Sequence, residues 1–308
     1  MNPTTLFINP QTKQVRSPWR TLTFLALSPQ LLLLASAHGQ GNSSNIEPVF
    51  SVISAIAIYI LWTFLLSWFC LRFFEQLNLA SLGFALNQGW TRQILIGCGI
   101  GALMTIGVVG LQILGGGTRI MANQVWWRGG ALDFSGLRST AGDVLAALVL
   151  LILAALFEEL TFRGYPFQTL LRGWGPLAPI LFFSIFFGIS HLGNPAATFF
   201  STTNTVLAGI WFSIAYLKTR SLWFTTSMHF TWNWMMGAFF GLPVSGYRIP
   251  HQPIFASTSE NPIWLTGGTY GSEGGAAATI VIVLATICIW YSKNLNQGNG
   301  GNTKQTNN

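Results

Sequence analysis

Long apolar runs separated by short polar gaps make up most of this chain. There are eight such runs, at 21–38, 49–71, 93–114, 143–172, 176–192, 199–217, 222–241 and 277–291. Most approach the ~20 residues that a helix needs to cross the ~30 Å hydrocarbon core of a bilayer. A helix satisfies its own backbone hydrogen bonds in lipid, so the pattern predicts an all-α protein. We expect a polytopic transmembrane helix bundle of about eight spans, with no need for a sheet.

The first apolar run has two interpretations. A basic lead, a short apolar core interrupted by Pro29, and the small residues Ala35-Ser36-Ala37 also describe a cleaved signal peptide. The lead is 20 residues long, however, and the topology described below requires a first span. We therefore favour a retained first helix over 21–38.

Composition supports a membrane protein and argues against a nucleic-acid partner. Hydrophobic residues make up 51% of the chain and charged residues only 7%, whereas a soluble domain carries about 25% charged residues. The net charge of +7 comes from 15 basic residues that lie singly between apolar runs and form no patch. Three dispersed cysteines, Cys70, Cys98 and Cys288, are interpreted as packing residues.

The basic residues also predict a topology. With the N-terminus inside, eleven of the fifteen fall in inner segments and four in outer ones. The inner set is Lys13, Arg16, Arg20, Arg72, Arg92, Arg163, Arg172, Lys218, Arg220, Lys293 and Lys304. Because Lys and Arg are enriched on the cytoplasmic side, both termini are predicted to be cytoplasmic.

These features divide the chain into five segments. A basic cytoplasmic tail (1–20) is followed by N-terminal transmembrane spans (21–142) and by a core that carries the candidate chemistry (143–241). An outer Gly/Pro-rich loop and the last span follow (242–293), and then an Asn/Gly-rich tail predicted to be disordered (294–308). The composition of the loops 115–142 and 242–275 predicts turns in both. In the first loop, Trp126-Trp127 is predicted to anchor the chain at the membrane interface.

Two adjacent carboxylates interrupt the apolar run 143–172. The stretch LLILAALFEELTFR places Glu158 and Glu159 in a chain with only 8 acidic residues. An ionisable group inside a membrane costs about 2.5–3.5 kcal/mol on insertion scales and indicates function by default. Glu159 and Arg163 share a helix face at i, i+4 and are expected to pair, which leaves Glu158 unpaired. The alternative is a structural ion pair with a solvated neighbour near a helix end.

Two histidines and an amide provide possible partners for Glu158. His191 follows Phe187 at i, i+4, and His229 shares a helix face with Asn233 at the same spacing. From Trp174, Glu158 lies sixteen residues back and His191 seventeen residues forward. At 1.5 Å per residue both lie about 24–26 Å from that turn, so a helical hairpin would bring them level. We expect one site in the cytoplasmic half of the membrane.

Three motifs give these residues a family resemblance. EELTFR matches EExxxR, FGISH matches FxxxH and HFTWN matches HxxxN, in this order on separate apolar segments. Together they resemble the CPBP family of intramembrane metalloproteases, which comprises the CAAX prenyl protease and bacteriocin-processing (Abi-like) group. The resemblance covers about 143–241. It extends to LTGGTYGSEGG, where members often carry Pro at the position of Ser272.

The resemblance implies an intramembrane endopeptidase that acts on a membrane-embedded or lipidated peptide or protein. By motif position, Glu158 would be the general base, and His191 would help to bind or activate the water. His229 and Asn233 would stabilise the oxyanion. Nothing in the sequence identifies the substrate.

The resemblance leaves the role of a metal open. It gives Glu159 and Arg163 the role of organising the site. Glu158, His191 and His229 could together hold zinc or another divalent metal with one open position. However, HExxH is absent, so a mechanism without bound metal is equally compatible with the sequence.

Two further classes of protein use such a cluster. A non-catalytic membrane scaffold or immunity protein could use the polar residues for specific helix packing. A proton-coupled transporter could use the same Glu, His and Arg side chains as a relay, although inverted repeats are not evident.

Overall fold

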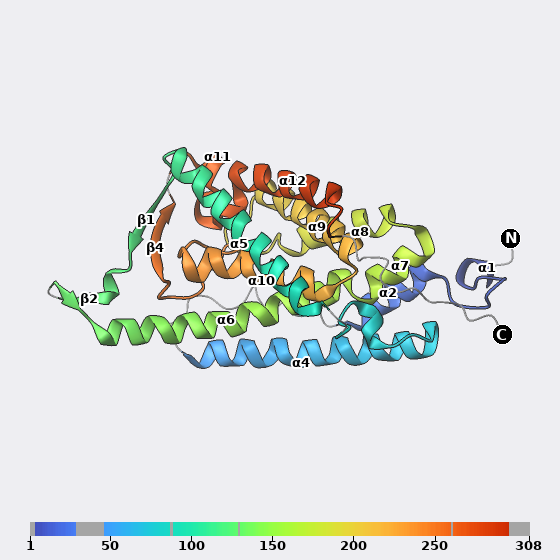
Figure 1. Ribbon diagram of the computed structural model, residues 1–308. Helices are drawn as coiled ribbons and strands as arrows, with labels where there is room; N and C mark the ends of the chain where they lie inside the picture. Colours follow the sequence, from blue (N-terminus) through green and yellow to red (C-terminus); the bar gives the residue numbers. More distant parts are fainter. Residues whose placement is uncertain (1–3, 29–45, 87–88, 129, 260, 296–308) are drawn as a thin grey trace.

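The computed structural model describes residues 4–28, 46–86, 89–128, 130–259 and 261–295, and these residues are mostly helical (Figure 1). The described part of the first apolar run belongs to α2 (Ser17–Leu27). The remainder of that run, and nearly all of the tail predicted to be disordered, lie outside the described residues.

Three helical segments of the described chain are long and apolar enough to cross a membrane, as expected of an integral membrane protein. They are Phe50–Glu75, Trp90–Leu114 and Phe134–Trp174. The first comprises α4 (Ile46–Cys70) and the π-helix η1 (Leu71–Glu75), the second is α5 (Trp90–Leu114), and the third comprises α6 (Phe134–Arg163) and α7 (Tyr165–Trp174). The prediction of eight spans is therefore met only in part.

The other apolar runs form helices that are shorter or more polar. α8 (Leu177–Ser190) and α12 (Ala276–Tyr291) are apolar but shorter than a full span. α9 (Phe199–Thr219) is long but carries Ser, Thr and Asn along its first turns. α10 (Leu222–Trp234) continues as the π-helix η4 (Met235–Phe239). Helices that neighbouring helices bury do not need a wholly apolar surface.

The segment 143–172, predicted as one apolar run, forms the two helices α6 and α7, and α6 begins nine residues before the predicted start. α6 begins at Phe134 because Asp133 caps it, accepting a hydrogen bond from the Ser135 backbone N–H at 2.9 Å. The helix ends at Arg163, where Gly164 separates it from α7, and Pro166 occupies the first turn of α7. The break leaves both carboxylates in the last turns of a continuous 30-residue helix.

The expectation of an all-α chain is wrong for the two outer loops. β1 (Thr118–Ala122) pairs antiparallel with β4 (Phe255–Ser259), with Thr118 opposite Ser259. A shorter pair joins β2 (Trp127–Arg128) to β3 (Ala131–Leu132). Both loops emerge at the same end of the bundle, so their extended backbones can satisfy each other (Figure 1).

The remaining short elements lie at the helix ends. They are α1 (Thr4–Phe7), η2 (Leu79–Leu82), η3 (Gln124–Trp126), α11 (Ile263–Thr266), η5 (Gly268–Tyr270) and η6 (Ser272–Gly274).

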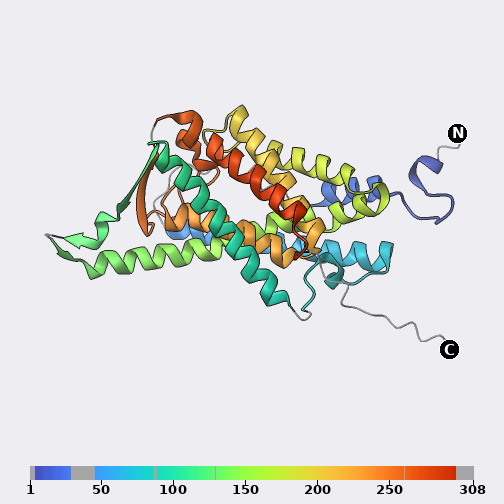
Figure 2. The same ribbon diagram turned by 45° about the horizontal axis from the view of Figure 1, so that its top comes forward.

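α10 is central in the bundle. It packs against α5, α6 and α9, while α4 lies along α6 and α9 packs against both α8 and α12 (Figures 1 and 2). The buried side chains around α10 include several aromatic and sulfur-containing ones, among them Trp211, Phe212, Met228 and Trp232. This packing brings the end of α6, the end of α8 and the middle of α10 together.

Candidate active site

The predicted ion pair between Glu159 and Arg163 is present and fully buried. Arg163 Nη1 lies 3.1 Å from Glu159 Oε1, and neither side chain has any exposed surface. Arg163 Nη2 donates a second hydrogen bond, at 3.0 Å, to the carbonyl of Gly209 on α9. A Cβ at Gly209 would lie 2.7 Å from the Ser184 backbone, so glycine permits the close approach of α8 and α9 at this point.

Aromatic rings surround the Arg163 guanidinium. Its central carbon lies 5.0 Å from the ring centroids of both Phe187 and Phe212. These rings offer a negative π face to the cation, in addition to the Glu159 carboxylate. Phe187 is also the first residue of the FxxxH motif, so this motif contributes to the environment of Arg163.

Glu159 also orients His229. Glu159 Oε1 lies 3.1 Å from His229 Nδ1. An ionised carboxylate can only accept, so Nδ1 carries the hydrogen. The imidazole ring lies against Phe212, with ring centroids 4.5 Å apart. Glu159 therefore connects Arg163 to His229 and fixes the orientation of the histidine ring.

Glu158 has a different environment. Its side chain is 27% exposed and lines a cavity, and its Oε2 lies 3.6 Å from His229 Nε2. This oxygen makes no hydrogen bond to a described residue. With the Nδ1 hydrogen used for Glu159, the Nε2 edge of the His229 ring faces Glu158 and the cavity.

His191 is held at the C-terminal end of α8. Its Nδ1 lies 2.8 Å from the Phe187 carbonyl oxygen, which can only accept, so Nδ1–H is the donor. Nε2 therefore keeps its lone pair and can accept a hydrogen bond from water. The FxxxH spacing thus places the carbonyl that determines the tautomer one helical turn before the histidine.

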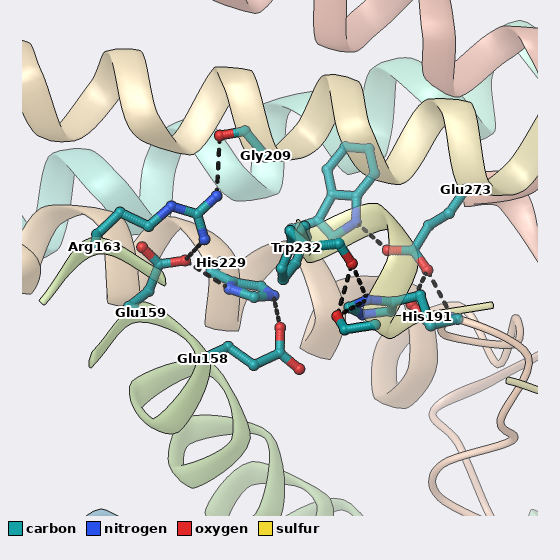
Figure 3. A network of polar contacts seen from close by, with 11 residues as sticks. Glu158, Glu159, Arg163, His191, Gly209, His229, Trp232 and Glu273 are labelled. Carbon is teal, nitrogen blue, oxygen red and sulfur yellow. Dashed lines mark hydrogen bonds and ion pairs between the residues drawn. The ribbon is translucent and has the colours of Figure 1, made fainter. Parts of the chain in front are cut away.

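The structure gathers four of the six predicted residues around one cavity of about 510 Å³. Glu158, His191, His229 and Asn233 line it. Glu159 and Arg163 lie on the Nδ1 side of the His229 ring, and Glu158 lies on its Nε2 side (Figure 3). Much of the remaining wall is apolar and comes from α4 and α6. A mostly apolar cavity with a few convergent polar groups is typical of a ligand or active site.

Sequence analysis missed one cavity residue, Glu273. Its Oε1 accepts a hydrogen bond from Trp232 Nε1 at 2.8 Å, and its Oε2 accepts two from the Ser245 backbone N–H and hydroxyl at 2.6 and 2.8 Å (Figure 3). It also lines the cavity. Two signals pointed to it, namely the scarcity of acidic residues in the chain and its place in the Gly-rich stretch of the family resemblance.

The loop that carries Glu273 is held rigidly. Asn204 on α9 donates hydrogen bonds to the carbonyls of Glu273 and Gly275 at 2.8 and 3.0 Å. Gly271 has φ +102°, and a Cβ there would lie 2.1 Å from the Pro243 carbonyl oxygen. Burial, with a smaller contribution from the Glu273 charge, raises the pKa of the Tyr270 hydroxyl to about 12, so that hydroxyl stays protonated. The Glu273 carboxylate is therefore preorganised.

The candidate ligands do not form a metal site in this arrangement. No group of three His, Cys, Asp or Glu side chains in the described parts of the chain is placed to hold a metal ion. His229 Nδ1 is used for Glu159 and His191 Nδ1 for a carbonyl, which leaves one nitrogen on each ring.

Residues 140–235 match a protein family described as Type II CAAX prenyl endopeptidase Rce1-like. The match covers the three motifs and confirms the family resemblance inferred from them. No curated protein and no solved structure gives a significant match.

Proposed function

We propose, from the premise that residues 140–235 belong to the type II CAAX prenyl endopeptidase family, that this protein is an intramembrane endopeptidase. Its substrate would be a membrane-embedded or lipidated peptide or protein. The observation that carries the proposal is the position of Glu158, which faces a mostly apolar cavity with a buried oxygen that accepts no hydrogen bond from a described residue. The catalytic core would extend over 143–241.

Glu158 and His191 would activate the water. Both line the cavity, and His191 Nε2 can accept one hydrogen of a water while Glu158 Oε2 accepts the other. As the water oxygen bonds to the substrate carbonyl carbon, its proton passes to Glu158.

His229 and Asn233 would stabilise the charge that forms on the carbonyl oxygen. His229 would donate its Nε2–H in this step, and the Asn233 amide would supply an N–H one helical turn further along α10. Fixed donors of this kind act strongly in a low-dielectric site. When the C–N bond breaks, Glu158 returns the proton to the leaving amine, and the carboxylate is regenerated.

Hydrolysis of palmitoylated peptides in liposomes that contain the purified full-length protein tests the proposal. Cleavage is followed by mass spectrometry. Glu158→Gln and His191→Ala should each abolish cleavage, and His229→Ala and Asn233→Ala should each slow it by about 10²–10³, the usual effect of losing one oxyanion donor. Combined losses should not multiply, because these residues act together.

Asp143 offers a matched control for Glu158. It lies on the same helix, outside the cavity lining, and accepts a hydrogen bond from the Gln252 backbone N–H. Asp143→Asn should leave cleavage largely intact. A wild-type protein that binds partners without hydrolysis would instead indicate a scaffold. Proton flux that depends on Glu158 would indicate a transporter.

A further inference from the structure

The cavity carries a negative charge that the proposed hydrolysis does not use. Glu158 and Glu273 both line it, and no Lys or Arg is among its described lining residues. Arg163 lies behind the wall, where it pairs with Glu159. Glu158 Oε2 lies 3.6 Å from His229 Nε2.

The partners of Glu273 orient its carboxylate without neutralising it. All three hydrogen bonds come from uncharged donors, the Trp232 indole and the backbone and hydroxyl of Ser245. Among the described residues, Glu273 forms no ion pair. Three donors stabilise an ionised carboxylate, and an apolar wall strengthens its attraction for a cation. A fixed anion of this kind is suited to bind a cationic group that enters the cavity.

Glu273 lies close to the proposed reaction centre along α10. Its partner Trp232 follows His229 by three residues, a rise of about 4.5 Å along the helix. An extended peptide advances ~3.3 Å per residue. A side chain that reaches Glu273 would therefore belong to a residue about one to three positions from the bond being cut.

We propose that Glu273 forms a specificity subsite for a Lys or Arg side chain near the scissile bond. This deepens the proposed function and rests on it. The same charge disfavours a substrate that would place its free C-terminal carboxylate at this end of the cavity. The preferred substrate is thus a membrane-associated peptide cut within its chain beside a basic residue.

The test uses palmitoylated peptides that are identical except for one residue near the centre, which is Lys, Gln or Glu. Binding is measured by fluorescence anisotropy on the Glu158→Gln protein, and cleavage is measured on proteins with Glu158 intact. The Lys peptide should be preferred over the Glu peptide by about 10- to 100-fold, the range for one hydrogen bond to a charged group.

Variants at Glu273 separate charge from structure. Glu273→Gln should remove most of the preference, and Glu273→Lys should reverse it toward the Glu peptide. Ser245→Ala, which removes one donor but keeps the carboxylate, should retain the preference for Lys. If thermal unfolding shows that Glu273→Lys does not fold, the result for Glu273→Gln alone determines whether the Lys preference depends on the Glu273 charge.

The two proposals fail in different ways. If folded Glu273→Gln binds and cleaves the three peptides with the same order of preference as the wild type, the subsite proposal is overturned, even if cleavage depends on Glu158. Absence of any Glu158-dependent cleavage overturns the protease proposal. In that case, a binding preference for the Lys peptide that is lost in Glu273→Gln still supports Glu273 as a cation-binding site. Equal binding of all three peptides by the Glu158→Gln protein also overturns the subsite.

Discussion

Glu158 and Glu159 are adjacent and chemically identical, yet they occupy opposite environments. Glu159 has no exposed surface and contacts both Arg163 and His229, whereas Glu158 is 27% exposed and faces the cavity. A helix turns neighbouring side chains about 100° apart, so one can enter the core while the other lines a cavity. This contrast predicts that substitutions at the two positions affect different properties.

The first residue-scale prediction concerns stability. Glu159→Gln and Arg163→Gln should each lower the free energy of unfolding by about 3–5 kcal/mol, because each strands a buried charge. The double variant should cost less than the sum of the two. Thermal unfolding in detergent measures this, with Glu158→Gln as a control that should remain close to wild type. A Glu158→Gln protein less stable than Glu159→Gln would reverse the two roles.

The second residue-scale prediction concerns metal removal. In the described chain no three side chains are placed to hold a metal ion, and each histidine has one nitrogen engaged. We therefore expect the cleavage rate to be unchanged, within about twofold, after dialysis against a chelator. Loss of cleavage on chelation, with recovery on adding zinc, would show that Glu158, His191 and His229 converge when the enzyme is active.

At the scale of elements, the site depends on a glycine-rich loop as much as on the helices. The segment 267–275 connects α11 to α12 and is fastened to α9 through Asn204. It brings Glu273 against Trp232 on α10. The loop therefore couples the last helix to the wall of the cavity.

Gly271 tests this coupling. Gly271→Ala would impose a left-handed conformation on alanine and also place its Cβ 2.1 Å from the Pro243 carbonyl oxygen. We expect a loss of stability well above the roughly 1 kcal/mol for the conformation alone, with altered peptide selectivity. Gly116→Ala is the matched control, because Gly116 has φ +71° and open space around it. Equal effects of the two substitutions in thermal unfolding would argue against tight packing of this loop.

At the scale of the whole molecule, loop contacts define two ends of the bundle. β1 and β4 bring the segments after α5 and after α10 together at one end. At the other end, the Leu222 backbone N–H donates a hydrogen bond to the Gly83 carbonyl at 3.0 Å. The predicted topology requires this grouping, with segments 72–92 and 218–221 on the side of the termini.

Cysteine labelling tests which end faces the cytoplasm. In a background that lacks Cys70, Cys98 and Cys288, a cysteine at Met121 should react with an impermeant reagent in intact cells. Cysteines at Thr12 and Asn294 should react only after permeabilisation, because the basic residues favour cytoplasmic termini. Labelling of Asn294→Cys from outside would contradict the predicted topology.

The features that the sequence predicted well are local ones. The Glu159–Arg163 pair follows from helical spacing, and the apolar length of α5 predicted its extent to within three residues at its start. Contacts between distant segments were not predictable in this way. Glu273 meets Trp232 across 41 positions, and the β1–β4 pairing joins two loops whose turn residues gave no strand signal. Asp133 is a typical N-cap residue, so the sequence did indicate the earlier start of α6. The prediction placed the start later because it followed the hydrophobic pattern alone.

The β1–β4 pairing also has a consequence for biosynthesis. Ala122 and its partner Phe255 are separated by about 130 residues. At ~5–20 residues per second, the ribosome needs on the order of 10 s to make that interval. Throughout this time β1 lacks its partner strand, and the loop that carries Glu273 has not yet been made. The β1–β4 pair and the part of the cavity wall that contains Glu273 can therefore form only after α10 has been synthesised.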